Sequence, residues 1–130
     1  MKLLIKNGHV IDPANRIDGI CNLAIADGKI FAIFTDESTF DFTPDRIIDA
    51  THLIVAPGLV DLGARLREPG NEHRSFLKSE LSAALAGGIT SLVCPPDTEP
   101  VLDEPGLVEM LKYRASSLNK AHIYPLGALT

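Results

Sequence analysis

The side chains with the clearest chemical potential lie in one short segment, DLGARLREPG, which begins at Asp61. Asp61 offers a carboxylate, although one carboxylate cannot hold a metal ion by itself. Arg65 keeps its positive charge at any relevant pH, and the planar donors of Arg67 suit a carboxylate partner. That partner is either a bound anion or an internal salt-bridge acceptor, Glu68 or Asp97, and the sequence leaves both open.

Other candidate metal ligands are scattered along the chain. Cys21 and Cys94 lie far apart without CxxC spacing, which favours buried thiols over a disulfide or a metal site. His73 follows the segment but has no paired His or Cys nearby, so we do not expect it to bind a metal. The other histidines are interpreted as structural; they are His9, His52 and His122.

The first half of the chain has the pattern of β-strands. Apolar residues alternate with polar ones over residues 3–11 and 21–34, and Asp27-Gly28 interrupts the second run as a hairpin turn would. Residues 46–58 add further strand with a polar break.

The second half alternates between strand and helix patterns. The order is strand, helix, strand, helix and strand, over residues 59–66, 75–88, 89–96, 103–120 and 121–130. Ser75 and Asp103 are the predicted N-caps, and Gly87-Gly88 ends the first helix. Because parallel neighbouring strands need a crossover connection, this order predicts an α/β fold with a parallel sheet.

Composition excludes several classes of function. The chain has 130 residues, a formal net charge of -5 and 45% hydrophobic residues, so it is neither disordered in composition nor basic enough to bind nucleic acid. No apolar run approaches the roughly 18 to 20 residues of a membrane span, and the polar N-terminus is unlike a signal peptide. We therefore expect a globular cytoplasmic protein without membrane or nucleic-acid partners.

Two runs, VAPGLVDLGARLREPG and AALAGGITSLVCPPDTEPVLD, resemble dihydroorotases, of the cyclic amidohydrolase family. The resemblance implies a small β-sandwich portion over residues 1–55, followed over residues 56–130 by the first β/α units of a TIM-like (β/α)8 barrel. Three strands and two helices are too few to close such a barrel, so the barrel is incomplete in this chain.

The chain departs from the family pattern where zinc chemistry would occur. Family enzymes carry Asp-x-His-x-His at the end of the first barrel strand, and both histidines bind Zn²⁺; here those positions are Gly63 and Arg65. Gly63 could instead ease close packing, and Arg65 could be a plain surface cation. Arg67 stands where the family's arginine binds the substrate carboxylate, and Asp97 replaces an asparagine that orients the substrate. The resemblance thus implies vestigial substrate-binding residues, with no catalytic residue and no metal.

These departures predict a non-catalytic dihydroorotase-like protein of pyrimidine biosynthesis. The resemblance suggests a structural subunit that binds the catalytic subunit of aspartate transcarbamoylase and forms a homo-oligomer. The alternative is an active zinc-dependent dihydroorotase or related amidohydrolase with an altered metal site; an unrelated β/α binding module would make the likeness a coincidence. Phe40 and Phe42, in the acidic loop 35–45, are either aromatic anchors for the partner or part of a mobile loop.

Overall fold

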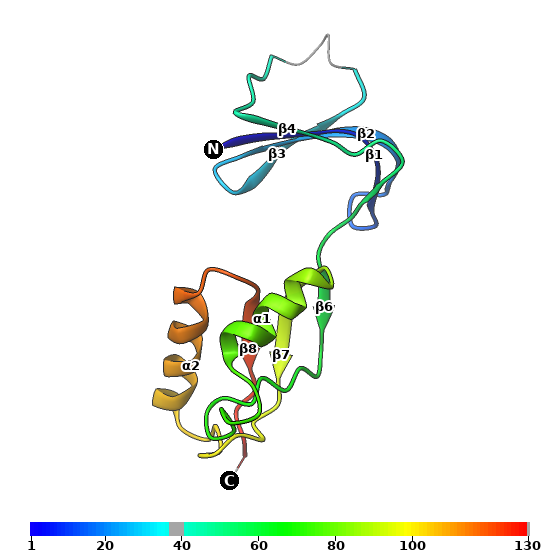
Figure 1. The fold of residues 1–130 in the computed structure, drawn as a ribbon. Coiled ribbons are helices and arrows are strands. Elements are labelled where there is room, and N and C mark those ends of the chain that lie inside the picture. Colours follow the sequence, from blue (N-terminus) through cyan, green and yellow to red (C-terminus); the bar gives the residue numbers. More distant parts are fainter. Residues whose placement is uncertain (37–40, 130) are drawn as a thin grey trace. The chain divides into compact units, whose positions relative to one another are not determined.

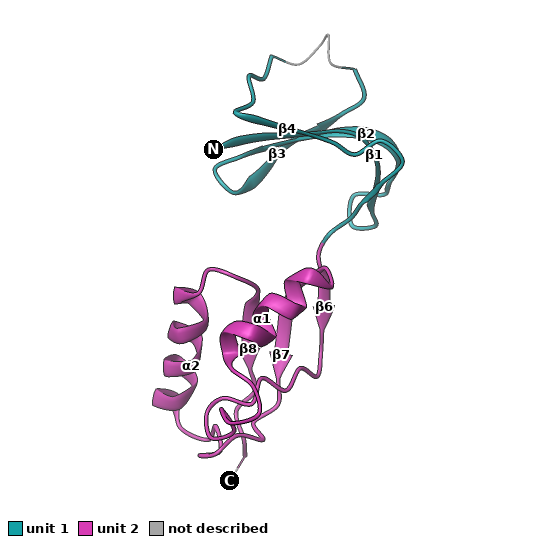
Figure 2. Cartoon of the chain, viewed as in Figure 1, with its two compact units in different colours: residues 1–57 teal, residues 58–130 magenta. Residues whose placement is uncertain are grey.

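The computed structural model describes residues 1–36 and 41–129 (Figure 1). The chain divides into two compact units, Met1–Pro57 and Gly58–Thr130 (Figure 2). Each unit has a sheet of its own, so the two are described separately.

Unit 1 is built on a five-stranded mixed sheet. Its strands are β1 (Lys2–Asp12), β2 (Ile17–Ala26), β3 (Lys29–Phe34), β4 (Arg46–Asp49) and β5 (Ile54–Val55). The strand β1 pairs antiparallel with β2 and parallel with both β4 and β5, while β3 pairs antiparallel with β2. Asp27 and Gly28 connect β2 to β3 with positive φ angles of 52° and 75°, so the predicted hairpin is confirmed.

Unit 2 is built on a three-stranded parallel sheet with two helices. The elements are β6 (Leu59–Asp61), α1 (Leu77–Ala86), β7 (Ile89–Cys94), α2 (Pro105–Ser117) and β8 (His122–Pro125). The strand order is β6-β7-β8, and both pairings are parallel. The predicted alternation of strands and helices is therefore confirmed (Figure 1).

The core of unit 2 lies between this sheet and its helices. Leu92 and Ile123 from the strands, Leu81 from α1 and Leu111 from α2 belong to one buried cluster. Burying a leucine side chain contributes about 1.5–3 kcal/mol, so this cluster holds both helices against the sheet whose strands lead into the candidate site.

The helix starts differ from the predicted ones. The N-cap of α1 is Phe76 rather than Ser75, and that of α2 is Glu104 rather than Asp103; neither cap makes a side-chain hydrogen bond. The buried Ser75 hydroxyl has no hydrogen-bond partner among the described residues. The predicted end of α1 is confirmed, since Gly87 is its C-cap and Gly88 follows with a φ of 78°.

Both cysteines are free thiols. Cys94 is buried, as predicted, and burial raises the pKa of its thiol to about 11, which makes it a poor nucleophile. Cys21 is only half-buried. Within the described residues, no helix is both long and apolar enough to cross a membrane.

Candidate functional site

The first candidate residues lie where β6 ends. The strand stops at Asp61, earlier than the predicted end at residue 66, because an Asp61 carboxylate oxygen accepts the Gly63 N–H at 2.9 Å and bends the chain. Past this bend, the Ala64 N–H donates to the Val93 carbonyl at 3.0 Å, which keeps the segment beside β7. Gly63 and Arg65 therefore lie in the loop that follows β6.

Arg65 and Asp97 form an ion pair. The Arg65 Nε lies 2.5 Å from Asp97 Oδ2, with 60% and 45% of the two side chains exposed. An exposed ion pair contributes at most about 1 kcal/mol to the stability of the fold. This pair therefore matters more for the charge at the site than for folding. The pair occupies the carboxyl ends of neighbouring parallel strands, where this fold class binds its ligands. Arg65 and Asp97, which both differ from the family pattern, therefore neutralise each other's charge.

Gly63 makes no close packing contact among the described residues. A Cβ built at this position meets no atom within 4 Å, so no neighbour described here requires a glycine. Its φ is outside the left-handed region, unlike that of Gly70. Within the described part of the chain, position 63 could therefore carry a side chain.

Arg67 has neither of the ion pairs considered for it. Asp97 pairs with Arg65, and Glu68 pairs with Arg114 instead. Arg67 itself is exposed, with a φ of 68° and no ion pair among the described residues. Its binding to an anion stays a prediction.

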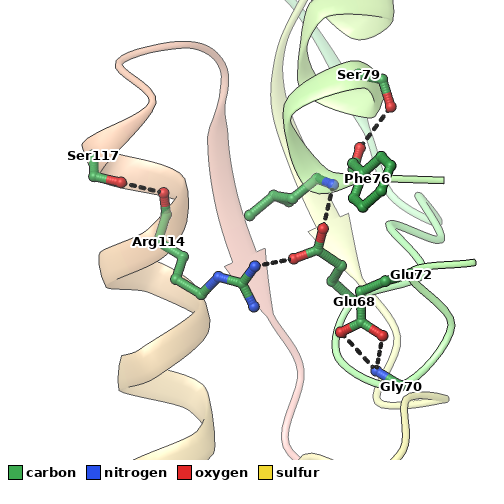
Figure 3. Close-up of polar contacts among 8 residues, drawn as sticks. Glu68, Gly70, Glu72, Phe76, Ser79, Arg114 and Ser117 are labelled. Carbon is green, nitrogen blue, oxygen red and sulfur yellow. Dashed lines mark hydrogen bonds and ion pairs between the residues drawn. The ribbon is translucent and has the colours of Figure 1, made fainter.

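Glu68 is the structural centre of the segment. It is 2% exposed, and its Oε1 accepts the Leu77 N–H at 2.8 Å, which supplies the helix start with the acceptor that Ser75 does not provide. Its Oε2 lies 2.5 Å from Arg114 Nη2 and makes no hydrogen bond of regular geometry, so this contact is a single-point ion pair (Figure 3). One buried carboxylate therefore ties the segment to both α1 and α2.

The turn after Glu68 packs against the loop that follows β7. The Glu99 N–H donates to the Pro69 carbonyl at 3.1 Å, and Gly70 has a φ of 97°. Both Glu72 carboxylate oxygens accept the Gly70 N–H, at 3.1 and 3.0 Å (Figure 3). The backbone N–H groups of Glu72 itself and of Gly70 hold the pKa of this carboxyl below its usual range.

Replacing Gly70 with alanine is expected to destabilise the protein by at least about 2 kcal/mol, because an L-residue is strained at this φ. A Cβ there would also lie 2.2 Å from the Glu99 carbonyl oxygen. Urea unfolding followed by circular dichroism measures the change. Gly63→Ala is the matched control and should be nearly neutral; equal stability of the two variants would contradict the packing described here.

The described residues do not bring a metal-binding set together. Within residues 1–36 and 41–129, no three His, Cys, Asp or Glu side chains are grouped so that they could hold a metal ion. Asp61 is engaged by the Gly63 N–H, and His73 is exposed. The described residues therefore do not by themselves form the zinc site that the family resemblance implies.

Sequence reasoning missed Arg114, which lies in the last turn of α2. No spacing rule connects it to Glu68, because the two meet only after the β/α units pack. Phe42, a predicted partner anchor, stacks on Phe31 with ring centroids 6.0 Å apart and lies under the Lys2 ammonium at 5.8 Å. Phe40 lies outside the described residues.

The comparisons with known proteins identify the family of the chain. The family model "Dihydro-orotase-like" matches residues 51–130. The chain is 45% identical over 130 residues to a dihydroorotase-like protein of Pseudomonas aeruginosa, and 41% identical over 131 residues to a dihydroorotase of Syntrophus aciditrophicus. Each match covers 100% of this chain and 30% of the relative, so the chain spans about a third of the length of these proteins.

A solved structure with the same fold is the L-hydantoinase (dihydropyrimidinase) of Arthrobacter aurescens, with a TM-score of 0.78 and 27% identity. The match covers 96% of this chain and 27% of the hydantoinase chain. This confirms the predicted fold class, a β-rich N-terminal portion followed by the first units of an amidohydrolase TIM barrel. The chain belongs to the dihydroorotase-like family.

Proposed function

We propose that this protein is a non-catalytic member of a cyclic amidohydrolase family related to pyrimidine biosynthesis. The observation that carries the proposal is that Arg65, in an ion pair with Asp97, stands with Gly63 at the two positions where active relatives are expected to hold zinc. No step of hydrolysis is assigned to these residues, because they do not fit the metal.

Charge explains why Arg65 opposes a metal ion. A guanidinium about 4 Å from a divalent cation is repelled by roughly 8 kcal/mol at an effective dielectric near 20. Asp97 neutralises the guanidinium in the present structure, and a metal would have to compete with Arg65 for that carboxylate. The Asp97 carboxylate is therefore already neutralised by a cation of the protein itself, Arg65.

Substrate recognition is also altered. An aspartate in place of asparagine lacks the two amide donors that could orient a substrate. The ion pair with Arg65 offsets much of the negative charge of Asp97, so the missing donors matter more than repulsion of a dicarboxylate. Of the two substrate-binding positions, Arg67 keeps the family's residue type and Asp97 does not.

Restoring both histidines should not restore ring closure. In the Gly63→His, Arg65→His double variant, Asp97 loses its partner and still lacks the amide donors, and losses within a catalytic site that acts as a unit are not additive. The triple variant, which carries Asp97→Asn as well, is the matched comparison for the double variant. Turnover of carbamoyl aspartate by the double variant, measured at saturating zinc, would show that Asp97 is not an obstacle.

The proposed role is that of a cytoplasmic structural subunit for aspartate transcarbamoylase, in a homo-oligomer. The family resemblance supports the partner, and loss of the metal site removes the catalytic reason for keeping the fold. A rigid barrel offers ample surface, since stable interfaces bury about 1,600 Å² in total.

Co-expression of the full-length protein with the transcarbamoylase catalytic subunit is expected to give a complex that co-purifies. Sedimentation should show the complex at a larger mass than either protein alone, and transcarbamoylase activity should depend on its presence. If the catalytic subunit assembles and works identically without this protein, the structural-subunit role is wrong.

A further inference from the structure

The strand β1 contains one irregularity, at the dipeptide Asn7-Gly8. The register with β2 shifts here, so that two residues of β1, Lys6 and Asn7, oppose Asn22 alone. The Asn22 side-chain oxygen accepts the Asn7 N–H at 2.9 Å, and Asn22 is 5% exposed. A buried side chain therefore fixes this bulge in place.

The structure favours both residues of the dipeptide. Asn7 has a φ of 60°, a conformation that asparagine adopts more readily than most residues. A Cβ at Gly8 would lie 2.5 Å from Val55 Cγ2 and 3.2 Å from the Ala50 Cβ, so any larger residue would displace the segment of residues 49–55. Backbone conformation and packing together account for Asn-Gly at this point.

Asn-Gly is also the dipeptide in which deamidation is least hindered, because glycine places no side chain beside its backbone nitrogen. The Gly8 N–H loses its proton to solvent, its nitrogen forms a bond to Asn7 Cγ, and the side-chain amide nitrogen leaves as ammonia. Water then opens the five-membered succinimide ring at either carbonyl, which gives aspartate or isoaspartate. Asn7 is the only asparagine of the 130 residues that precedes a glycine.

The Asn7 side chain is anchored to Asp49, at the end of β4. Hydrogen bonds from Thr51 and then from the Asn7 side chain hold the pKa of the Asp49 carboxyl below its usual range. Ring closure turns the Asn7 side chain onto the Gly8 nitrogen, so it competes with this hydrogen bond.

The backbone is fixed on both sides of the dipeptide. The Ala50 N–H donates to the Lys6 carbonyl at 2.8 Å, and the His9 N–H donates to the Leu53 carbonyl at 2.9 Å. Closing a five-membered ring rotates the backbone between these two bonds, so both oppose the reaction. Both are made by residues 49–55.

We propose that Asn7-Gly8 is a self-modification site that residues 49–55 keep closed, so that it deamidates only after this segment leaves β1. Local opening of this kind costs less free energy than global unfolding. The strand β5 pairs with β1 through only two residues, Ile54 and Val55, which favours its opening before the rest of the sheet.

The product records the opening. A carboxylate at position 7 cannot donate a hydrogen bond to Asp49 and is repelled by it, and isoaspartate adds a backbone carbon to the bulge. The modified strand therefore holds residues 49–55 less firmly, and refolding does not reverse the change.

Deamidation of the peptide that contains Asn7 is followed by mass spectrometry in the full-length protein, both folded and unfolded in guanidinium. The rate in the folded protein should be lower on the order of 10-fold or more. Equal rates in the two states would overturn the proposal, because the fold would then give no protection.

Two valine variants separate local opening from global unfolding. Val55→Ala loosens the segment and leaves the dipeptide unchanged, so it should speed deamidation of the folded protein by about 3-fold or more. Val108→Ala is the matched control, because Val108 packs against the core of unit 2, and it should leave the rate nearly unchanged. An unchanged rate in Val55→Ala, or equal acceleration in both variants, would show that residues 49–55 are not the gate.

Hydrogen exchange of the wild-type protein gives a test that needs no variant. The protection of the Ala50 and His9 N–H groups measures the opening directly, and it should match the slowing of deamidation within about 3-fold. Deamidation much faster than this opening allows would overturn the proposal. Asn7→Asp should speed exchange of the Ala50 N–H, and unchanged exchange would contradict the weakening expected of the product.

Discussion

Full-length protein purified from zinc-supplemented cells is expected to hold far less than one zinc per chain and to interconvert no carbamoyl aspartate and dihydroorotate. Zinc enzymes of this class need ligands that converge on the metal, and Arg65 places a cation paired with Asp97 at the end of β6 instead. Without the metal, turnover should fall at least about 10⁴-fold below that of a zinc-containing relative.

Metal analysis and a coupled assay on the same preparation measure both quantities. The dihydroorotase of Syntrophus aciditrophicus, purified in parallel, is a suitable positive control. About one zinc per chain, together with turnover that a chelator abolishes, would favour the alternative of an active enzyme with an altered metal site.

Arg114→Met is expected to lower the free energy of unfolding by about 3 kcal/mol. Removing one partner of a buried ion pair leaves the other charge uncompensated, at a typical cost of roughly 3–5 kcal/mol. The side chain of Glu68 is 3% exposed in this pair while that of Arg114 is 46% exposed, which favours the lower end of that range. The methionine keeps the apolar stem and so limits the loss of packing.

The same helix provides the control for this experiment. Lys112 pairs with Glu109 at 2.8 Å, but both side chains are largely exposed, so Lys112→Met should change stability by less than about 0.5 kcal/mol. Urea unfolding of both variants gives the comparison. Similar stabilities for the two would mean that Glu68 does not depend on its ion pair.

The elements could be predicted because their signals are local. The Asp27-Gly28 hairpin and the alternating strands and helices of unit 2 follow from turn chemistry and periodicity. Helix starts were predicted less well. Ser75 has the right residue type for a cap, but a carboxylate nine positions earlier, in Glu68, accepts the Leu77 N–H.

The site could be predicted only in part, because its contacts are between distant residues. Gly63 and Arg65 were recognised by position, but the partner of Arg65 is Asp97, 32 residues further on. That contact exists because β6 and β7 are parallel neighbours whose ends meet. Both salt bridges considered for Arg67 were wrong, because local spacing cannot show which arginine reaches Glu68.

Glu68 has a consequence for how such a protein can evolve. Its carboxylate contacts both helices without any metal ion, so selection for folding alone would be enough to retain it. Among the described residues, Gly63 makes no comparable contact and Arg65 makes only an exposed ion pair, so folding constrains these two positions less. One short segment can therefore keep the residues that identify its family while the positions that would bind the metal change.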